Sequence, residues 1–335
     1  MSNWEDMLAE FRALGGVAEN ICLKEGALGR GLFPKDRTKP YKLHIPAALL
    51  VDVNHVKFED DVFRVGPNAQ IGERAKRFLE DYEREFSWGV ANQDVRDVIQ
   101  TLHEAPAALR ELMQNPFNLD YWLVEPTDSA AVQSRYLTSR RLEFKPDLAV
   151  VIPIVELANH GQTRGYRIDE SGVGLEGKTD GEILAQYHPE DPLGMFVGWG
   201  FVSENESFAC SLSLKVEKKG PPLRVMRKEV NLELRPKPFM PDVTREGDTL
   251  VLSFLMLGNR NNPQLPRAIF DRVMREAGRK HATEMFDYIQ HVNRLQWLKL
   301  IKASEAAPAR LGQLLRKLAG SQLEAMSHNI GGLQF

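Results

Sequence analysis

Two kinds of sequence pattern alternate along this chain, and that alternation constrains the fold most. Short apolar groups broken by glycine, proline and aspartate occupy residues 19–66 and 165–255, a pattern typical of strands and turns. Apolar residues recur every three or four positions over 69–116 and again over 266–330, which is typical of amphipathic helices. The sequence therefore predicts an α+β fold, in which a β-rich core is interrupted by a helical insert and followed by a helical C-terminal domain.

Domain boundaries follow from the changes of pattern. We expect an N-terminal helix and the first part of the core over 1–66, a helical insert over 67–130, the second part of the core over 131–255 and a helical C-terminal domain over 256–335. The first helix is predicted to start at a capping box, Ser2 with Glu5, and to end at Gly15 and Gly16. Pro308 can start a new helix near the C-terminus.

Composition narrows the class of protein. The chain has 335 residues, of which 43% are hydrophobic and 27% charged, as in a soluble globular protein. A formal net charge of -3 gives no overall attraction to nucleic acid or to an anionic membrane. Cys22 and Cys210 are the only cysteines, so neither a disulfide framework nor a zinc cluster is expected. Without a secretory signal or an apolar run long enough for a membrane span, we expect a cytoplasmic monomer.

One motif suggests a nucleotide site. GVGLEGKT at 172–179 fits the P-loop pattern, with Lys178 as the phosphate ligand. A working P-loop follows a buried strand and opens a long helix, whereas RGYRIDES before it is polar and His188 and Pro189 follow soon after. We therefore interpret the segment as two short strands joined by a glycine turn, with ATP binding at Lys178 as the alternative.

Three other segments contain candidate site residues: GALGRGLF at 26–33, PIVELANH at 153–160 and GEILAQY at 181–187. Taken singly, each has an ordinary structural explanation: a hairpin turn for the glycines, a hydrogen-bonded structural histidine for His160 and a core aromatic for Tyr187. The functional alternative is a pocket, because glycines let a backbone approach a ligand closely and Asn159 can both donate and accept hydrogen bonds.

In combination, these segments resemble SET-domain methyltransferases, in the branch similar to Rubisco large-subunit lysine methyltransferase and actin-histidine methyltransferase. The resemblance also rests on HIPAALLV at 44–51, TSRRLEF at 138–144 and GWGFVSEN at 198–205, in the family's order. It covers roughly residues 18–216. It implies a β-rich SET core with a knot-like crossing of two chain segments.

The resemblance further implies S-adenosylmethionine as the cofactor, no metal ion, and Tyr187 as the catalytic residue between cofactor and substrate. The implied cofactor-binding residues are Glu25, Gly26, Leu28, Gly29, Arg30, Gly31, Ser139, Arg140, Asn159, His160 and Tyr187. The implied walls of the substrate channel are Trp199 and Phe201. The C-terminal helices would dock a protein substrate.

Several residues depart from the family pattern. Glu156 stands where the family has aspartate, and Gly161 where serine is common. HPEDPLG at 188–194 replaces the usual residues after the catalytic tyrosine, and Trp199 replaces a tyrosine of the plant relatives. Tryptophan keeps an aromatic wall but lacks the hydroxyl, which predicts a narrower or differently polarised acceptor pocket.

Two classes of function remain open. The first is a protein methyltransferase acting on lysine, with histidine as the alternative acceptor, and the second is a catalytically silent binding module on the same core. Retention of Tyr187 together with Asn159 and His160 favours the enzyme. In the last helix, the leucine stripe of Leu311, Leu314, Leu315, Leu318 and Leu323 indicates core packing.

Overall fold

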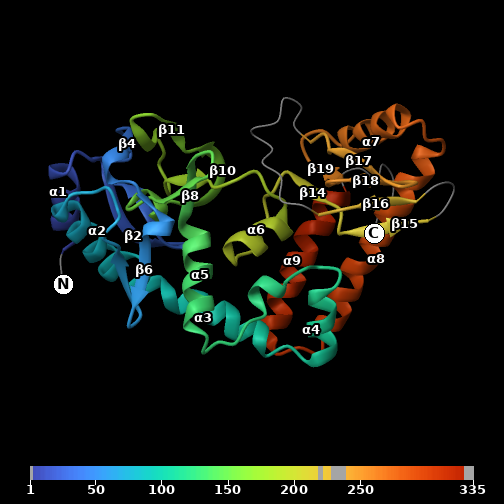
Figure 1. Ribbon diagram of the computed structural model, residues 1–335, viewed down its shortest axis with the longest axis horizontal. Coiled ribbons are helices and arrows are strands. Elements are labelled where there is room, and N and C mark those ends of the chain that lie inside the picture. The colour runs from blue at the N-terminus through green and yellow to red at the C-terminus, as the bar shows by residue number, and fades with distance from the viewer. Residues whose placement is uncertain (1–2, 218–221, 228–238, 328–335) are drawn as a thin grey trace. The chain divides into compact units, whose positions relative to one another are not determined.

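The computed structural model describes residues 3–217, 222–227 and 239–327, and it confirms the predicted α+β class (Figure 1). The chain forms two compact units, each built from two segments. The first unit comprises Met1–Asp97 and Glu125–His188, and the second comprises Val98–Val124 and Pro189–Phe335. The division falls inside helix α3 (Trp88–His103). Among the described residues, we find no helix with the length and apolar character needed to cross a bilayer.

The first unit is rich in strands. Its helices are α1 (Trp4–Ala13), α2 (Glu73–Phe86), the start of α3 and α5 (Ser129–Arg140), with short 3-10 helices η1 (Ala47–Leu49), η2 (Val53–His55) and η4 (Val155–Leu157). Its strands are β1 (Val17–Glu19), β2 (Ile21–Gly26), β3 (Gly29–Pro34), β4 (Tyr41–Pro46), β5 (Val51–Asp52), β6 (Val56–Glu59), β7 (Val62–Val65), β8 (Arg141–Lys145), β9 (Leu148–Val151), β10 (Asn159–Gly165), β11 (Arg167–Asp169), β12 (Gly172–Gly177) and β13 (Leu184–Gln186).

Small sheets join parts of the first unit that are distant in sequence. The largest has the order β1-β4-β12-β11 and is antiparallel throughout, so the N-terminal strands pair with strands that follow the helical insert. In a second sheet, β9 lies between β5 and β8. β10 and β13 pair in parallel, with Asn159 opposite Leu184 and His160 opposite Ala185. The two predicted parts of the core therefore form common sheets.

The helices of the first unit bury one face each, as their sequence periodicity predicts. In α2, Phe78 and Leu79 are buried, and the side chain of Phe78 stacks on Phe11 of α1. At the start of α1, the side chain of Asn3 accepts a hydrogen bond from Glu5 N, so Asn3 is the N-cap. The predicted cap at Ser2 lies outside the described residues.

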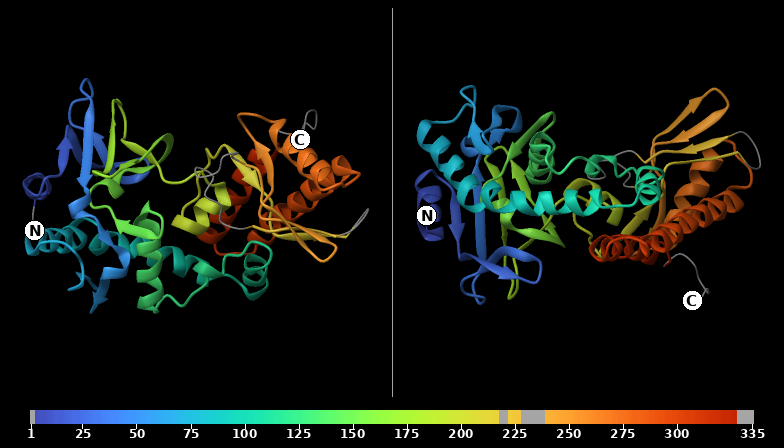
Figure 2. Two further views of the ribbon diagram at one scale, coloured as in Figure 1. Left: turned by 45° about the horizontal axis from the view of Figure 1, so that its top comes forward. Right: turned by 90° about the horizontal axis from the view of Figure 1, so that it is seen from below.

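The second unit combines a sheet with helices that lie beside it. Its helices are the end of α3, α4 (Ala107–Gln114), α6 (Pro192–Trp199), α7 (Leu265–Glu276), α8 (Ala282–Ser304) and α9 (Ala309–Ser327), with the 3-10 helix η3 (Asp120–Trp122). Its strands are β14 (Phe208–Cys210), β15 (Leu214–Val216), β16 (Leu223–Val225), β17 (Val243–Glu246), β18 (Thr249–Leu252) and β19 (Met256–Asn259). Helices α8 and α9 run side by side in both sets of views (Figures 1 and 2).

Buried polar side chains hold the second unit together. The Asp191 carboxylate accepts hydrogen bonds from Cys210 N at 2.8 Å, from Gln322 Nε2 at 2.7 Å and from the guanidinium of Arg227. Burial raises the pKa of Asp191, but Arg227 and these donors outweigh that effect and hold the pKa below its ordinary value. One carboxylate thus links the start of α6 to β14 and to α9.

One sequence prediction differs from the structure here. Residues 165–255 were expected to be strands and turns, but 192–199 form α6, because Asp191 caps its N-terminus, Pro192 starts it and Gly200 ends it with φ +78°. Its sequence is apolar all round, so no helical periodicity marks it.

The P-loop alternative is wrong, because its residues form a strand. Gly172–Gly177 make up β12, which pairs along its whole length with β4. Residues 178–191 are all described and contain no helix. Lys178 therefore has no helix N-terminus beside it to bind a phosphate. The expected core packing of α9 is confirmed for Leu311, Leu315 and Leu318, which are fully buried, whereas Leu314 and Leu323 are half-buried.

We predict that Asp191→Asn destabilises the second unit by about 3–5 kcal/mol, because it leaves the guanidinium of Arg227 buried without its counter-charge. Chemical denaturation measures the change. As a control, Glu217→Gln removes the exposed ion pair with Lys215 and should cost less than about 1 kcal/mol. Equal effects of the two substitutions would contradict this account.

Candidate functional site

The three segments singled out in the sequence meet in the first unit. Ile183 N donates to Leu32 O at 2.8 Å, which joins the residues before β13 to β3. Asn159 begins β10 opposite Leu184 in β13, and its side-chain nitrogen lies 3.2 Å from Arg30 O in β3. Residues more than a hundred positions apart therefore share one local structure.

The glycine segment is a hairpin, as the structural interpretation predicted. β2 and β3 pair up to Gly26 opposite Gly29, and Gly29 has φ +89°, a conformation that favours glycine. Leu28 at the tip is 58% exposed. Gly31 serves a second purpose, because a Cβ there would overlap the carboxylate of Glu182 and lie 2.7 Å from Asn159 Nδ2. The missing side chain at Gly31 makes room for this pair.

Asn159 and Glu182 form the polar centre of the site. Asn159 Nδ2 donates to Glu182 Oε1 at 2.5 Å and to Arg30 O at 3.2 Å, which uses both of its N–H groups. The amide orientation is thereby fixed, and Oδ1 is the acceptor that the side chain presents. Glu182 was not among the residues predicted for the site. It stands directly after Gly181 in GEILAQY, one of the three segments with candidate residues, but only the folded chain brings its side chain beside Gly31.

Tyr187 lies directly after β13, against His160 and Tyr166. Its hydroxyl donates to Ala158 O at 2.9 Å, and its ring meets the His160 ring edge to face at 5.2 Å and stacks on Tyr166 at 6.5 Å. Burial raises the pKa of Tyr187 to about 12, with Arg140 acting in the opposite direction. At neutral pH the residue is therefore a protonated phenol.

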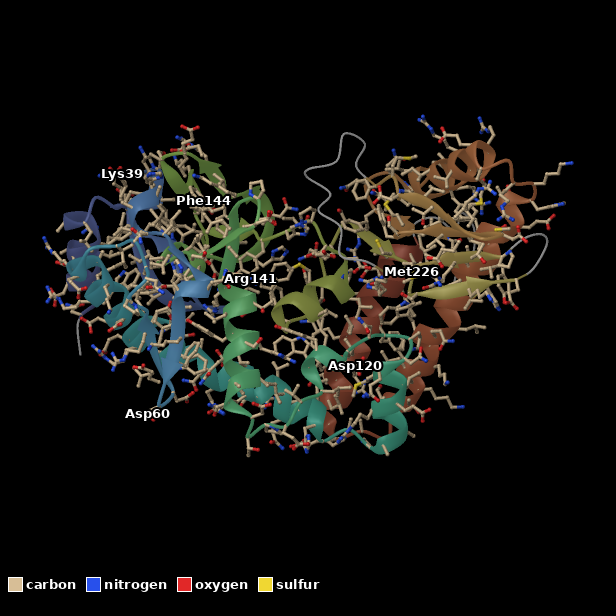
Figure 3. The ribbon with its side chains drawn as sticks, viewed as in Figure 1. Lys39, Asp60, Asp120, Arg141, Phe144 and Met226 are labelled. Carbon is tan, nitrogen blue, oxygen red and sulfur yellow. The ribbon has the colours of Figure 1, made fainter. Side chains whose placement is uncertain are left out.

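Ser139 and Arg140 end α5, next to the start of β8, which Arg141 marks in Figure 3. Ser139 Oγ donates to Tyr136 O at 2.8 Å, a bond within the helix. Arg140 Nη1 lies 3.6 Å from Glu156 Oε2, and its guanidinium stands over the Tyr136 ring at 5.6 Å. Arg140 and Tyr187 influence each other's pKa, so both belong to one electrostatic site.

A strained turn directs Glu156 into this region. Ile154 has φ +68° and ψ -50°, and Val155 N donates to Pro153 O at 2.8 Å, which defines a γ-turn. A positive φ is rare for a β-branched residue and costs on the order of 1–3 kcal/mol. Such strain persists where the surroundings impose it, and here Ile154 and Val155 are completely buried. The turn separates β9 from Asn159 and His160.

The remaining predicted residues lie at the edge of this arrangement or in the other unit. Glu25 is exposed in β2, beside the tip of the hairpin. Trp199 ends α6 and Phe201 follows it, both in the second unit. Their role in a substrate channel with Tyr187 stays a prediction.

Comparison with known proteins finds similarity among solved structures. No protein-family profile matches this chain, and no curated protein sequence does. Among solved structures, the SET domain of LSMT, crystallised with lysine and AdoHcy, is 13% identical, with 97% of this chain and 88% of that chain covered and a TM-score of 0.38. So low a score does not establish a common fold.

We predict that Gly31→Ala breaks the hydrogen bond between Asn159 and Glu182. The new Cβ would overlap the end of the Glu182 side chain, which can swing away, so we expect a stability loss of about 1 kcal/mol rather than unfolding. Thermal unfolding measures the loss. Gly181→Ala is the matched control, because the nearest atom to its Cβ would be Thr179 Oγ1 at 3.9 Å. A larger loss in the control would contradict the proposed crowding.

Proposed function

We propose that this chain is an S-adenosylmethionine-dependent protein methyltransferase that transfers a methyl group to a side-chain nitrogen, with lysine as the acceptor. The observation that carries the proposal is the meeting of the glycine hairpin, Asn159–His160 and Tyr187 in one unit. These are the segments in which the sequence resembles SET-domain methyltransferases. A module without activity has no evident need to keep all three together.

The residues present suit the proposed cofactor. S-adenosylmethionine carries an ammonium and a carboxylate at its amino-acid end, and its sulfonium supplies an electrophilic methyl group. Asn159 Oδ1 and the Glu182 carboxylate are acceptors for the ammonium, and Arg140 can pair with the carboxylate. The absent Cβ at Gly31 leaves the room in which the side chains of Glu182 and Asn159 stand beside β3.

Tyr187 would act as a neutral hydroxyl in this reaction. Since its pKa is raised to about 12, it does not serve as a base at neutral pH. Its hydroxyl donates to Ala158 O, and a hydroxyl oxygen is also able to accept weak C–H···O contacts such as those from a reacting methyl group. The lysine must arrive deprotonated, and removal of the amine from water favours that form. The enzyme then contributes mainly alignment of the acceptor nitrogen.

We predict that Tyr187→Phe lowers methyl transfer by about tenfold, because it removes weak C–H···O contacts to the methyl group and the hydrogen bond to Ala158 O that orients the ring. The assay follows labelled methyl groups from S-adenosylmethionine into proteins of a cell lysate, and calorimetry follows cofactor binding. Binding should persist in the variant. The rate should also show no titration of Tyr187 between about pH 7 and pH 10, because a phenol with a pKa of about 12 stays protonated there.

Other outcomes of this assay distinguish the alternatives. Labelled histidine in place of lysine would identify the acceptor as an imidazole. Cofactor binding without any labelled protein would favour a catalytically silent module. If calorimetry detects no binding of S-adenosylmethionine, the methyltransferase proposal fails at its first step.

Trp199 offers a test of the proposed channel. If its ring limits the space around the acceptor nitrogen, then Trp199→Tyr should increase the share of multiply methylated product. Mass spectrometry of the product measures that share, and Trp4→Tyr on α1 provides a control of the same chemical change. An unchanged product distribution would show that Trp199 does not line the channel.

The C-terminal helical segment, predicted over 256–335, is the proposed docking site for the protein substrate. Its long helix α8 has two exposed leucines, Leu295 at 51% and Leu298 at 44%. They are one helical turn apart and thus share a face. We place the reaction in the cytoplasm and the protein as a monomer, without nucleic acid or membrane as a partner.

A further inference from the structure

A buried network of acidic and hydroxyl groups lies behind Arg140 in the first unit. Its members are Tyr82 and Glu83 of α2, Ser87 between α2 and α3, Tyr136 of α5 and Glu156 of η4. Each is at least nine-tenths buried, and Glu83 is only 2% exposed. Two carboxyl groups thus lie together in the interior of the unit. Burial of a charged carboxylate is costly, so this pair needs an explanation.

The oxygen atoms of these residues form an unbroken series of contacts. Tyr82 Oη lies 2.8 Å from Glu156 Oε1, and Ser87 Oγ contacts both Glu156 Oε1 and Tyr136 Oη. Tyr136 Oη lies 2.5 Å from Glu83 Oε2. The junction of α2 and α3 imposes this arrangement on Ser87, because the helices approach so closely that a side chain at residue 89 would overlap a backbone carbonyl of α2.

A count of protons shows that the network needs one more than its hydroxyl groups supply. The four contacts are Tyr82–Glu156, Ser87–Glu156, Ser87–Tyr136 and Tyr136–Glu83, and each requires one proton between its oxygen atoms. The hydroxyls of Tyr82, Ser87 and Tyr136 carry one proton each. The fourth proton must come from a carboxyl group, so either Glu83 or Glu156 is a neutral acid.

Charge decides which carboxyl group holds the proton. Arg140 lies 3.6 Å from Glu156 Oε2 and favours the charged form of Glu156. The titratable groups that face Glu83 are Glu156, Tyr82, Tyr136 and, more weakly, Arg140. Burial, followed by the charge of Glu156, raises the pKa of Glu83 to about 8, against smaller opposing effects of Tyr136, Trp88 N and Arg140.

We propose that Glu83 is a positioning residue that, as a neutral acid, donates to Tyr136 and thereby completes the network that holds Glu156 as the anion paired with Arg140. The hydrogen bonds are then all donated in the same direction. Glu83 donates to Tyr136, Tyr136 donates to Ser87, and Ser87 donates to Glu156. Glu156 and Arg140 cancel each other's charge. The link from Arg140 to cofactor binding rests on the proposed function, whereas the network itself does not.

Loss of the Glu83 proton would disrupt this arrangement. The donor to Tyr136 disappears, and a second negative charge appears near Glu156 in the interior. Because the pKa of Glu83 is higher in the folded chain than in the unfolded chain, the folded state binds more protons between the two values. The contribution to stability is therefore complete below about pH 4.5 and is lost as the pH rises toward about 8.

The test compares the pH dependence of unfolding in the wild type and in Glu83→Gln. The glutamine amide is neutral at every pH and can donate to Tyr136, as the protonated acid does. Between about pH 6 and pH 8, the equilibrium constant for folding of the wild type should fall by up to tenfold per pH unit relative to the variant. Glu73→Gln makes the same change at an exposed position of α2 and should follow the wild type. Equal pH dependence in the wild type and Glu83→Gln would overturn the proposal.

Infrared spectroscopy of the wild type gives a second measurement that needs no variant. A protonated carboxyl group absorbs separately from carboxylates, and at about pH 7 ordinary carboxyl groups are ionised. We expect one such absorption, lost as the pH rises past about 8. Its absence at about pH 7 would overturn the proposal.

Cofactor binding then tests the positioning role of Glu83. Calorimetry should show that the affinity of the wild type for S-adenosylmethionine falls by about tenfold above pH 8, whereas the affinity of Glu83→Gln is unchanged. An equal loss in both proteins would overturn the positioning role. If neither protein binds S-adenosylmethionine at any pH, the proposed function fails, while the unfolding and infrared results still decide whether Glu83 holds the proton.

Discussion

The pairing of β10 with β13 beside the glycine hairpin is the interaction on which the candidate site depends. It places Asn159 opposite Leu184 and within 3.2 Å of Arg30 O, and the adjoining bond from Ile183 N to Leu32 O fixes the third segment. These contacts join the two parts of the core across the whole helical insert. Without them, the polar group of Asn159 and the aromatic ring of Tyr187 would have no common location.

Much of the fold could be predicted because its signals are local. Periodicity located the helices of the insert and the C-terminal domain, and alternating short apolar groups located the strands. The order of three motifs also pointed to one pocket, and Asn159, His160 and Tyr187 do lie together. Helix α6 could not be predicted by the same rule, because its sequence is apolar on every side and lacks a helical period.

The contacts of the polar groups near the candidate site could not be predicted, because they join residues that are far apart in the sequence. Glu83 lies on the apolar face of α2, one turn after Leu79, so periodicity places it inside, but its contact with Tyr136 of α5 arises only in the folded chain. Glu182 follows an unremarkable turn, and its contact with Asn159 requires the absence of a side chain at Gly31. The γ-turn at Ile154 could not be predicted from the sequence either, because a positive φ is rare for isoleucine.

The central claim is that the hairpin, Asn159–His160 and Tyr187 form one cofactor site. Its most direct test is nuclear magnetic resonance of the labelled protein during titration with S-adenosylhomocysteine, the product form of the proposed cofactor. We predict shifts of the backbone amides of Gly31, Asn159, His160 and Tyr187 together, with one common affinity. Saturating ligand that leaves these amides unshifted, or shifts a different part of the chain alone, would contradict the account.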